Sequence, residues 1–521
     1  MQLYKQVCAI IFSILICSQK TYSQLPPNFD KYIDSVLTAF NVPGISVAIV
    51  KDDNVVLTKG YGIKHLGDTA KVDAHTLFPI ASNSKAFTAM ALAVLVDKGK
   101  LKWDDPVMNY LPWFKMSDPW VTAQITIRDL LVHHTGIPAY AGDVLLFPPS
   151  TYTRKEILQK LKDIPIVNSF RTMYAYDNIL YVCAGEVIST VSGMSWEDFV
   201  RTNILEKAGM NETLSRFTDV KKATNVATGH VYIHDKLMPV NEFSEQLIGD
   251  AGNSAGGILC NANDMAKWLI TELDSGKTPL QNRIIKPADV NDLWKVITPI
   301  PVSVAPAVIK PAQMNSFGYA LGVRTYNYGK YKIVSHGGKL DGYVSQVLIV
   351  PDLKIGIAVL TNQESTGAYW SIIYHLLDSY MKNPYFNWIK GYKELLDSSL
   401  ADDKREWEKA VIIPSSTAPK PTVDNKYVGV YKDDFYGELT ISKDDSGLKV
   451  QFNQTPQFTG RLTPFQYETF IAKFNNTALK ADAYLSFTLA PDGSIESCKL
   501  QVIDPTSDIS FNGLIFKKES K

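Results

Sequence analysis

The sequence predicts an α+β fold: an antiparallel sheet flanked by helices, with an inserted helical lobe, followed by a small all-β domain. Strand-like runs occur near the start of the chain and return after residue 331. Between residues 105 and 315, short helical patterns alternate with frequent prolines and glycines, and beyond residue 425 only strand-length runs occur. At 521 residues the chain exceeds the roughly 250–300 residues at which one core stops growing, so at least two domains are expected.

The first 23 residues have the pattern of a secretory signal peptide. Lys5 precedes an apolar run from Val7 to Cys17, and Thr21-Tyr22-Ser23 offers a small-residue cleavage site. The apolar run is too short to span a bilayer, and no later run reaches the necessary length. We therefore expect residues 1–23 to be removed and the mature chain, which has no transmembrane helix, to be periplasmic or extracellular.

Residues 24–395 are expected to form the first domain, with its sheet assembled from both ends of the segment. Apolar residues at helical spacing predict helices, and short apolar runs bounded by turn residues predict strands. The predicted helices are 29–40, 84–98 and 369–381, and the predicted strands are 45–50, 55–60, 332–336, 345–350 and 355–361.

The composition changes after residue 395. Residues 396–425 are charged and then rich in Pro, Ser and Thr, which is typical of an interdomain linker. Residues 426–521 carry strand-length runs broken by Asp445-Ser446-Gly447 and Pro491-Asp492-Gly493, which predict a small all-β barrel or sandwich.

The charge balance and the cysteine count exclude several classes of function. Lys+Arg 53 balances Asp+Glu 53, and the chain has neither a basic run nor a zinc-finger pattern, so we expect no nucleic-acid partner. Cleavage would leave Cys183, Cys260 and Cys498; one disulfide or three buried free thiols both fit that count. No metal-ligand spacing is present, and no metal or cofactor is expected.

Ser82 and Lys85 are the first candidates for catalysis. They lie three residues apart at the start of a predicted helix, so the hydroxyl and the ammonium can meet. A helix N-terminus favours developing negative charge, and a desolvated lysine can act as a base. Ser-x-x-Lys also occurs at Ser379 and Ser446, but neither of these serines begins a helix.

Two further groups lie downstream. Tyr176-Asp177-Asn178 precedes an apolar helical run; a phenol and an amide there suit proton transfer and orientation, although a plain helix cap would also explain the polar residues. His336-Gly337-Gly338 ends a predicted strand, where glycines allow close backbone approach for an oxyanion hole or simply form a turn.

In order and in local setting, these three groups resemble the serine β-lactamase and penicillin-binding-protein superfamily, in particular its class C-like branch. The family signature of Ser-x-x-Lys, Tyr-x-Asn and a Lys/His-x-Gly triplet corresponds to Ser82–Lys85, Tyr176–Asn178 and His336–Gly338. The likeness covers roughly residues 28–385, and it implies a β-lactamase-like fold. His133 and His134, in a neighbouring segment of the same likeness, are expected to be structural.

The resemblance implies an acyl-enzyme mechanism with Ser82 as nucleophile. Lys85 and Tyr176 would share the proton transfers, while Asn178, His336 and Gly338 would bind or orient the substrate. The backbone N–H groups of Ser82 and Lys339 would form the oxyanion hole.

The third motif departs from the Lys-Thr-Gly of class C β-lactamases. His336-Gly337 removes a fixed cation and a hydroxyl, so a peptidase of D-aminopeptidase type or an esterase is expected ahead of a β-lactamase. A penicillin-binding sensor without turnover is a second alternative. The substrate partner is a small molecule or peptide. The C-terminal segment resembles the lipocalin-like domain of some relatives; covering the active site, self-association and a passive role all stay open for it.

Overall fold

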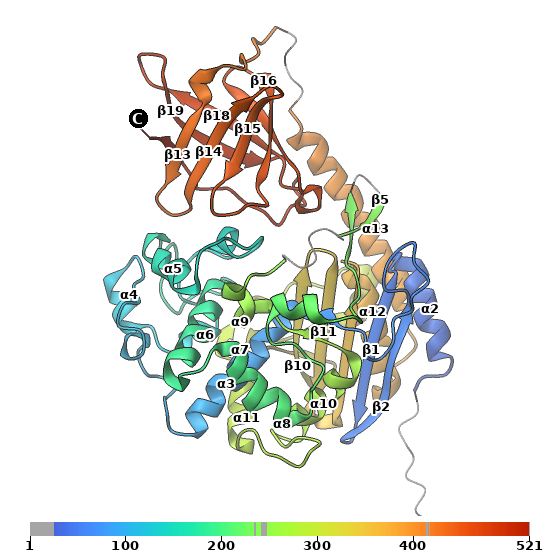
Figure 1. The fold of residues 1–521 in the computed structure, drawn as a ribbon. Coiled ribbons are helices and arrows are strands. Elements are labelled where there is room, and N and C mark those ends of the chain that lie inside the picture. Colours follow the sequence, from blue (N-terminus) through green and yellow to red (C-terminus); the bar gives the residue numbers. More distant parts are fainter. Residues whose placement is uncertain (1–24, 234–235, 241–246, 413–414, 416, 520–521) are drawn as a thin grey trace, which may run out of the picture.

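A computed structural model describes residues 25–233, 236–240, 247–412, 415 and 417–519. The predicted signal peptide therefore lies outside the described residues. The chain forms a sheet-and-helix part, to which a helical lobe belongs, and a β-barrel that lies against it (Figure 1). The long helix α13 (Trp388–Ala410) leads from the first part toward the barrel (Figure 1).

The central sheet confirms the predicted fold class. Its strand order is β2-β1-β12-β11-β10-β9-β8-β7 and every neighbouring pair is antiparallel, so the first hairpin of the chain adds directly to a strand from the far end of the domain. Ile45 pairs with Thr361, for example. The strands are β1 Gly44–Lys51, β2 Asn54–Gly62, β7 Thr298–Pro299, β8 Phe317–Tyr319, β9 Arg324–Tyr328, β10 Tyr331–Leu340, β11 Tyr343–Val350 and β12 Ile355–Thr361.

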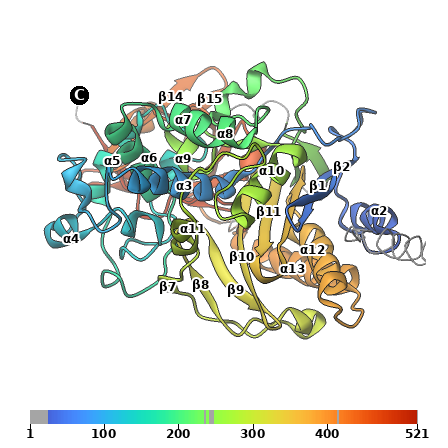
Figure 2. The same ribbon diagram turned by 90° about the horizontal axis from the view of Figure 1, so that it is seen from below.

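Helices cover both faces of this sheet (Figure 2). On one face, α2 (Phe29–Phe40) buries Phe29, Ile33, Val36 and Phe40, whose spacing places them on one side of the helix. This face is completed by α12 (Thr366–Met381) and α13. The other face packs on α3 (Ser84–Asp97) and α10 (Ala262–Leu273).

The helical lobe is inserted between β2 and β7, as the sequence predicts. Its central helix α6 (Ile179–Ser192) is buried along most of its length and packs on α3. No single helix in the described ranges is long and apolar enough to cross a membrane; the bent pair Ile179–Ser192 and Trp196–Ala208 meets the length and composition criteria only jointly. The other helices of this region are α4 Pro119–Gln124, α5 Arg154–Gln159, α7 Trp196–Val200, α8 Glu206–Ala208, α9 Asn253–Gly256 and α11 Pro287–Leu293.

The C-terminal strands close into a barrel, β13 to β20, filled by large apolar side chains such as Tyr427, Tyr431 and Phe452. Closure removes the unpaired edges that an open sheet would expose. The barrel form of the predicted all-β domain is therefore the one observed. Its strands are β13 Gly429–Asp433, β14 Gly437–Asp444, β15 Gly447–Phe452, β16 Thr459–Gln466, β17 Thr469–Phe474, β18 Ala483–Leu489, β19 Ile495–Val502 and β20 Phe516–Lys518.

The first part of the predicted linker is helical. Residues 396–410 are the second part of α13. Ion pairs one helical turn apart support this segment, among them Lys393 with Asp397 and Lys409 with Glu406. The charge density that suggested a linker is that of a helix largely surrounded by solvent.

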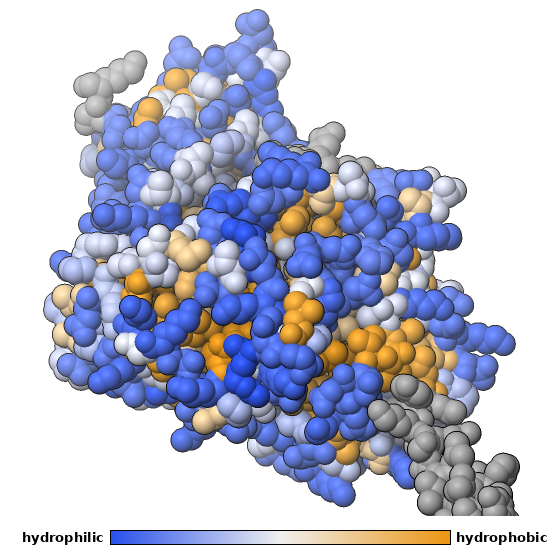
Figure 3. Space-filling view, turned by 60° about the horizontal axis from the view of Figure 1, so that its bottom comes forward, coloured by the Kyte–Doolittle hydropathy of each residue, from blue (hydrophilic) through white to orange (hydrophobic). Residues whose placement is uncertain are grey.

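The remaining cysteines and the surface complete the description. Cys183, Cys260 and Cys498 are all buried free thiols, which settles the alternative left open by the sequence. On the face shown in Figure 3, hydrophilic residues cover most of the surface and apolar residues gather in separate patches between them.

Candidate active site

Ser82 lies in a tight turn directly before α3. This 3₁₀ turn, η1 (Ala81–Asn83), begins with Ala81 at φ 48°, a left-handed backbone conformation that residues other than glycine rarely adopt. The Ser345 hydroxyl on β11 holds the turn by donating to the Ile80 carbonyl (2.9 Å) and accepting from Asn83 Nδ2 (2.8 Å). The turn that presents Ser82 is thus fixed to the sheet.

Lys85 is completely buried and points at Ser82. Its Nζ donates to Ser82 Oγ (3.1 Å), Asn178 Oδ1 (2.7 Å) and the Ala255 carbonyl (2.8 Å), so all three of its donors have partners when it is charged. Burial lowers the pKa of Lys85 to about 7, although nearby Asp143 and Asp177 act in the opposite direction. A large fraction of neutral amine is therefore present near neutral pH.

In the segment before α6, three consecutive residues, 176–178, make different contacts. Asp177 Oδ1 accepts from the Leu180 backbone N–H at 3.2 Å, so the capping role falls to Asp177. This leaves the Asn178 amide free to bind Lys85. The Tyr176 ring lies over Lys85 Nζ, 5.0 Å from ring centroid to nitrogen. Both candidates of the Tyr-x-Asn group thus contact Lys85.

Tyr176 is a neutral phenol at physiological pH. Burial raises its pKa well above the ordinary value, and opposing contributions from Arg324 and from a hydrogen bond with Ser82 do not overcome this. The phenol can therefore pass protons on, but it holds its own proton more firmly than Lys85 does. Of the two, Lys85 is the better base.

Arg324 and Asp143 line the same cavity and were not identified from the sequence. The Arg324 guanidinium lies 5.3 Å from the Tyr176 ring centroid and receives no ion pair from any carboxylate among the described residues. Asp143 Oδ2 accepts from Asn178 Nδ2 at 2.8 Å, and burial raises the pKa of Asp143 to about 7. In the sequence, the indication of a functional role for Arg324 is that this arginine stands within the largely apolar segment Leu321–Tyr328.

Strand β10 brings the third motif to Ser82. A Cβ atom added at Gly338 would lie 2.1 Å from the Ile80 carbonyl oxygen, so only glycine allows the strand to pass this close to the nucleophile's turn. Because β9 pairs with β10 only as far as Ser335, the backbone at Gly338 and Lys339 has no β9 partner. The Lys339 segment lines the cavity together with Ser82.

The side chain of His336 does not line the cavity. Its ring is 2% exposed and is not part of the cavity wall; Nε2 lies 2.8 Å from the Tyr319 hydroxyl and Nδ1 lies 2.7 Å from the Gly337 carbonyl. Burial, reinforced by Arg324 and Lys85, holds the pKa of His336 well below its ordinary value. A neutral His336 thus supports the site from behind through Tyr319, and a buried cation that lines the cavity is supplied by Arg324.

The site opens into a cavity of about 1800 Å³. The barrel forms part of its wall through the β13–β14 turn and residues 507–515, and Asp508 forms an ion pair with Lys339 at 2.6 Å. The helical lobe holds the barrel in place: Tyr152 Oη and Lys160 Nζ donate to the carbonyls of Tyr436 (3.0 Å) and Phe435 (2.5 Å). Of the roles left open for this domain, the geometry matches the covering of the site.

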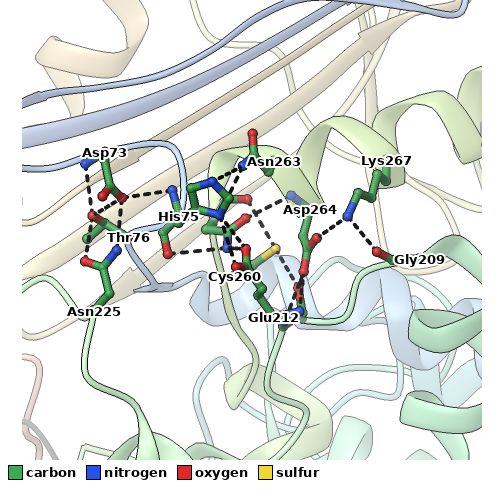
Figure 4. A network of polar contacts seen from close by, with 12 residues as sticks. Asp73, His75, Thr76, Gly209, Glu212, Asn225, Cys260, Asn263, Asp264 and Lys267 are labelled. Carbon is green, nitrogen blue, oxygen red and sulfur yellow. Dashed lines mark hydrogen bonds and ion pairs between the residues drawn. The ribbon is translucent and has the colours of Figure 1, made fainter.

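A polar network supports the strand that leads to Ser82 (Figure 4). Strand β3 (Phe78–Pro79) pairs with β6 (Leu259–Cys260), and buried Asp264 ties the segment after α8 to α10 by accepting from the backbone of Glu212 and Thr213. Glu212 in turn binds His75, three residues before β3. Within the described ranges, no group of three or more His, Cys, Asp or Glu side chains is arranged to hold a metal ion; His134 instead binds Asp129 at 2.7 Å.

The fold and the site together define a serine hydrolase in which a lysine lies one helical turn after the serine. The chain belongs to the beta-lactamase family, whose model matches residues 29–379; residues 414–514 match a domain of unknown function, DUF3471.

Relatives and solved structures agree with this assignment. Unguisins hydrolase ungD' of Aspergillus campestris is 30% identical over 90% of this chain and 88% of its own length. The octameric penicillin-binding protein homologue from Pyrococcus abyssi has a TM-score of 0.59 at 22% identity and covers 94% of this chain and 99% of its own. A class C beta-lactamase has a TM-score of 0.55 at 19% identity and covers 67% of this chain and 95% of its own. At these identities the two structures show the shared fold.

Proposed function

We propose that this chain is an exported serine hydrolase that cleaves an amide or ester bond through an acyl-enzyme on Ser82, as a peptidase of D-aminopeptidase type or an esterase. The observation that carries the proposal is the buried Lys85 amine, 3.1 Å from Ser82 Oγ, with a pKa lowered to about 7. A relative named as a hydrolase over nearly its whole length supports the reaction class. Export rests on the signal-peptide pattern of residues 1–23.

The proposed reaction begins with a proton moving from Ser82 Oγ to neutral Lys85. Oγ then bonds to the carbonyl carbon, and the oxyanion is held by the backbone N–H groups of Ser82 and Lys339. The bond to the leaving group breaks as the leaving atom takes a proton from Lys85, relayed by the Tyr176 hydroxyl. Water, deprotonated by the same amine, releases the acyl group and restores Ser82.

Arg324 suits a substrate that carries a negative charge next to the scissile bond. Arg324 presents a guanidinium to the cavity, and its neighbours among the described residues are phenols, not ion-paired carboxylates. A carboxylate of the substrate would supply the missing counter-ion. Arg324 could likewise receive the carboxylate of a β-lactam, so the cation that the sequence seemed to lack is present. This observation keeps β-lactam hydrolysis as a second candidate function.

Self-association through the barrel stays a prediction. The octameric state named for the Pyrococcus abyssi protein makes it worth measuring by light scattering.

The decisive experiment compares wild type with Ser82→Ala on purified protein. Chromogenic short esters, D- and L-aminoacyl anilides and a chromogenic cephalosporin would be tested side by side. We expect Ser82→Ala to lose roughly 10⁴–10⁶-fold in rate on the best substrate, and a fluorophosphonate to label only wild type. Equal labelling of both proteins would contradict the proposal. A stable adduct without turnover would instead identify a binding protein.

A further inference from the structure

The cavity at Ser82 continues into an apolar arm that the mechanism above does not use. We define the apolar arm by Met314, Phe317, Tyr326, Tyr369, Trp370 and Tyr392, which line the same cavity as Ser82. They come from β8, β9, α12, α13 and the segment before β8. Phe317 packs edge-on against Tyr326, and Tyr369 lies beside Trp370 with 5.4 Å between ring centroids. The walls are therefore mainly aromatic and held by mutual packing.

The arm is reached around the open edge of β10. Strand β9 ends its pairing at Ser335, so no strand blocks the passage from Ser82 past Gly337. Gly337 has no side chain to fill this gap; a Cβ atom there would approach Gln346 Oε1 to 2.8 Å. One continuous space thus joins the nucleophile to the aromatic walls.

In the proposed reaction, the arm is on the leaving-group side of the scissile bond. The leaving atom must receive its proton from Lys85 through Tyr176, so the leaving group is on the side of Tyr176, where Arg324 stacks. Arg324 and Tyr326 are two residues apart on β9 and therefore project from the same face of the strand. A group that leaves past Tyr176 consequently has Arg324 first and the arm next in its path.

We propose that the apolar arm is the subsite for an aromatic or branched aliphatic group on the leaving part of the substrate. This inference rests on the proposed function and names its substrate class: an ester or amide whose leaving fragment carries a large apolar side chain. Burial of such a side chain between aromatic walls stabilises the bound state in proportion to the apolar area removed from water.

The test uses pairs of esters that differ in one group. Hippuryl glycolate and hippuryl phenyllactate (both enantiomers) share the acyl group and the leaving-group carboxylate and differ by a benzyl group on the leaving side. N-acetylglycyl and N-acetylphenylalanyl glycolate differ by a benzyl group on the acyl side. We expect one phenyllactate enantiomer to exceed glycolate in kcat/KM by roughly 10- to 100-fold.

A variant then tests the location. Thr366 is exposed at the start of α12 and lines the cavity, so Thr366→Trp narrows the arm from a position outside the core, and Thr366→Ser is its matched control. Labelling of Ser82 with a small fluorophosphonate counts active sites in each preparation. We expect Thr366→Trp to remove at least tenfold of the phenyllactate preference and Thr366→Ser to retain it.

The possible results separate the inference about the apolar arm from the proposed function. Equal rates on glycolate and both phenyllactates, with Ser82-dependent turnover intact, would overturn the inference and leave the proposed function standing. A Thr366→Trp effect on the acyl-side pair alone would also overturn it, because the arm would then serve the acyl group. Absence of Ser82-dependent turnover on these esters and on the full panel of short esters, aminoacyl anilides and cephalosporin would overturn the proposed function and the inference together.

Discussion

At Lys85, burial and two carboxylates act on the pKa in opposite directions. Burial dominates and lowers the pKa to about 7, while Asp143 and Asp177 favour the charged form. Because the neutral amine is the base, activity requires loss of this proton. The pH dependence of the reaction therefore reports directly on this residue.

We expect kcat/KM to rise with pH through about 7 and to fall close to tenfold per pH unit below it. Asp143→Asn removes a carboxylate that raises the pKa of Lys85, so this limb should move to lower pH. Asp163→Asn removes the same charge from another part of the cavity wall and is the matched control. A limb that is unmoved in Asp143→Asn, or equally moved in both variants, would contradict the assignment of Lys85 as base.

Arg324 supplies the second prediction at this scale. Removing its charge by Arg324→Gln should weaken binding of an ester with a leaving-group carboxylate by roughly 10- to 100-fold, because hydrogen bonds to charged groups are worth about 1.5–3 kcal/mol. The measurement is the ratio of KM values for that ester and its neutral amide analogue. If the ratio is the same in wild type and Arg324→Gln, the cation does not bind the substrate.

The pairing of Ser82 with Lys85 could be predicted from local spacing, because the two residues are one helical turn apart. The roles of Tyr176 and Asn178 were implied by the family resemblance, because these residues are about 90 positions from Lys85 and only the fold brings them to it. Arg324 could not be predicted in this way, since only sheet pairing brings β9 beside Tyr176. The orientation of His336 was also beyond the sequence, because it depends on the Tyr319 hydroxyl.

At the scale of elements, strands β10 and β11 and the turn η1 position Ser82.

The amphipathic helix α2 and the β1–β2 hairpin follow from periodicity and agree with their predicted ranges. Helix α13 was not predicted from the sequence, because the second half of this helix has little apolar periodicity and is supported by ion pairs instead. The close contact of β10 with the turn at Ile80 is possible because Gly338 has no side chain.

Gly338→Ala tests that contact. Its Cβ would lie 2.1 Å from a backbone oxygen that cannot move without displacing η1, so we expect a loss of about 1–3 kcal/mol in the free energy of unfolding and at least 100-fold in kcat/KM. Gly356→Ala in β12 is the control, since this strand glycine lies outside the cavity wall and its Cβ meets only the side chain of Leu269. Urea unfolding and steady-state kinetics measure both. Equal losses in the two variants would show that the approach at Gly338 is not limiting.

At the scale of the whole molecule, the barrel is a wall of the active site. It contacts the helical lobe through Tyr152 and Lys160 and meets β10 through the ion pair of Asp508 with Lys339. This ion pair is largely exposed and contributes little by itself. Hydrogen bonds from the lobe, those of Tyr152 and Lys160 and those of Thr151 with Gln454, are therefore the stronger polar contacts that hold the barrel.

The double variant Tyr152→Phe/Lys160→Met removes both donors. We expect KM to rise several-fold while kcat changes little, with a loss of roughly 1–3 kcal/mol in the free energy of unfolding. Tyr467→Phe/Lys473→Met makes the same chemical changes on exposed positions of the barrel and is the control. An unchanged KM in the first variant would show that the barrel does not shape the substrate site.

Because the barrel forms part of the cavity wall, it limits the size of the molecules that can reach Ser82. Ser82 lies at the bottom of a hollow bounded by the sheet, the lobe and the barrel, so a molecule must thread into that hollow before its carbonyl can be attacked. We expect intact folded polypeptides to escape digestion whatever their composition, and short molecules to be accepted. Selection by bulk would then precede any selection by chemistry.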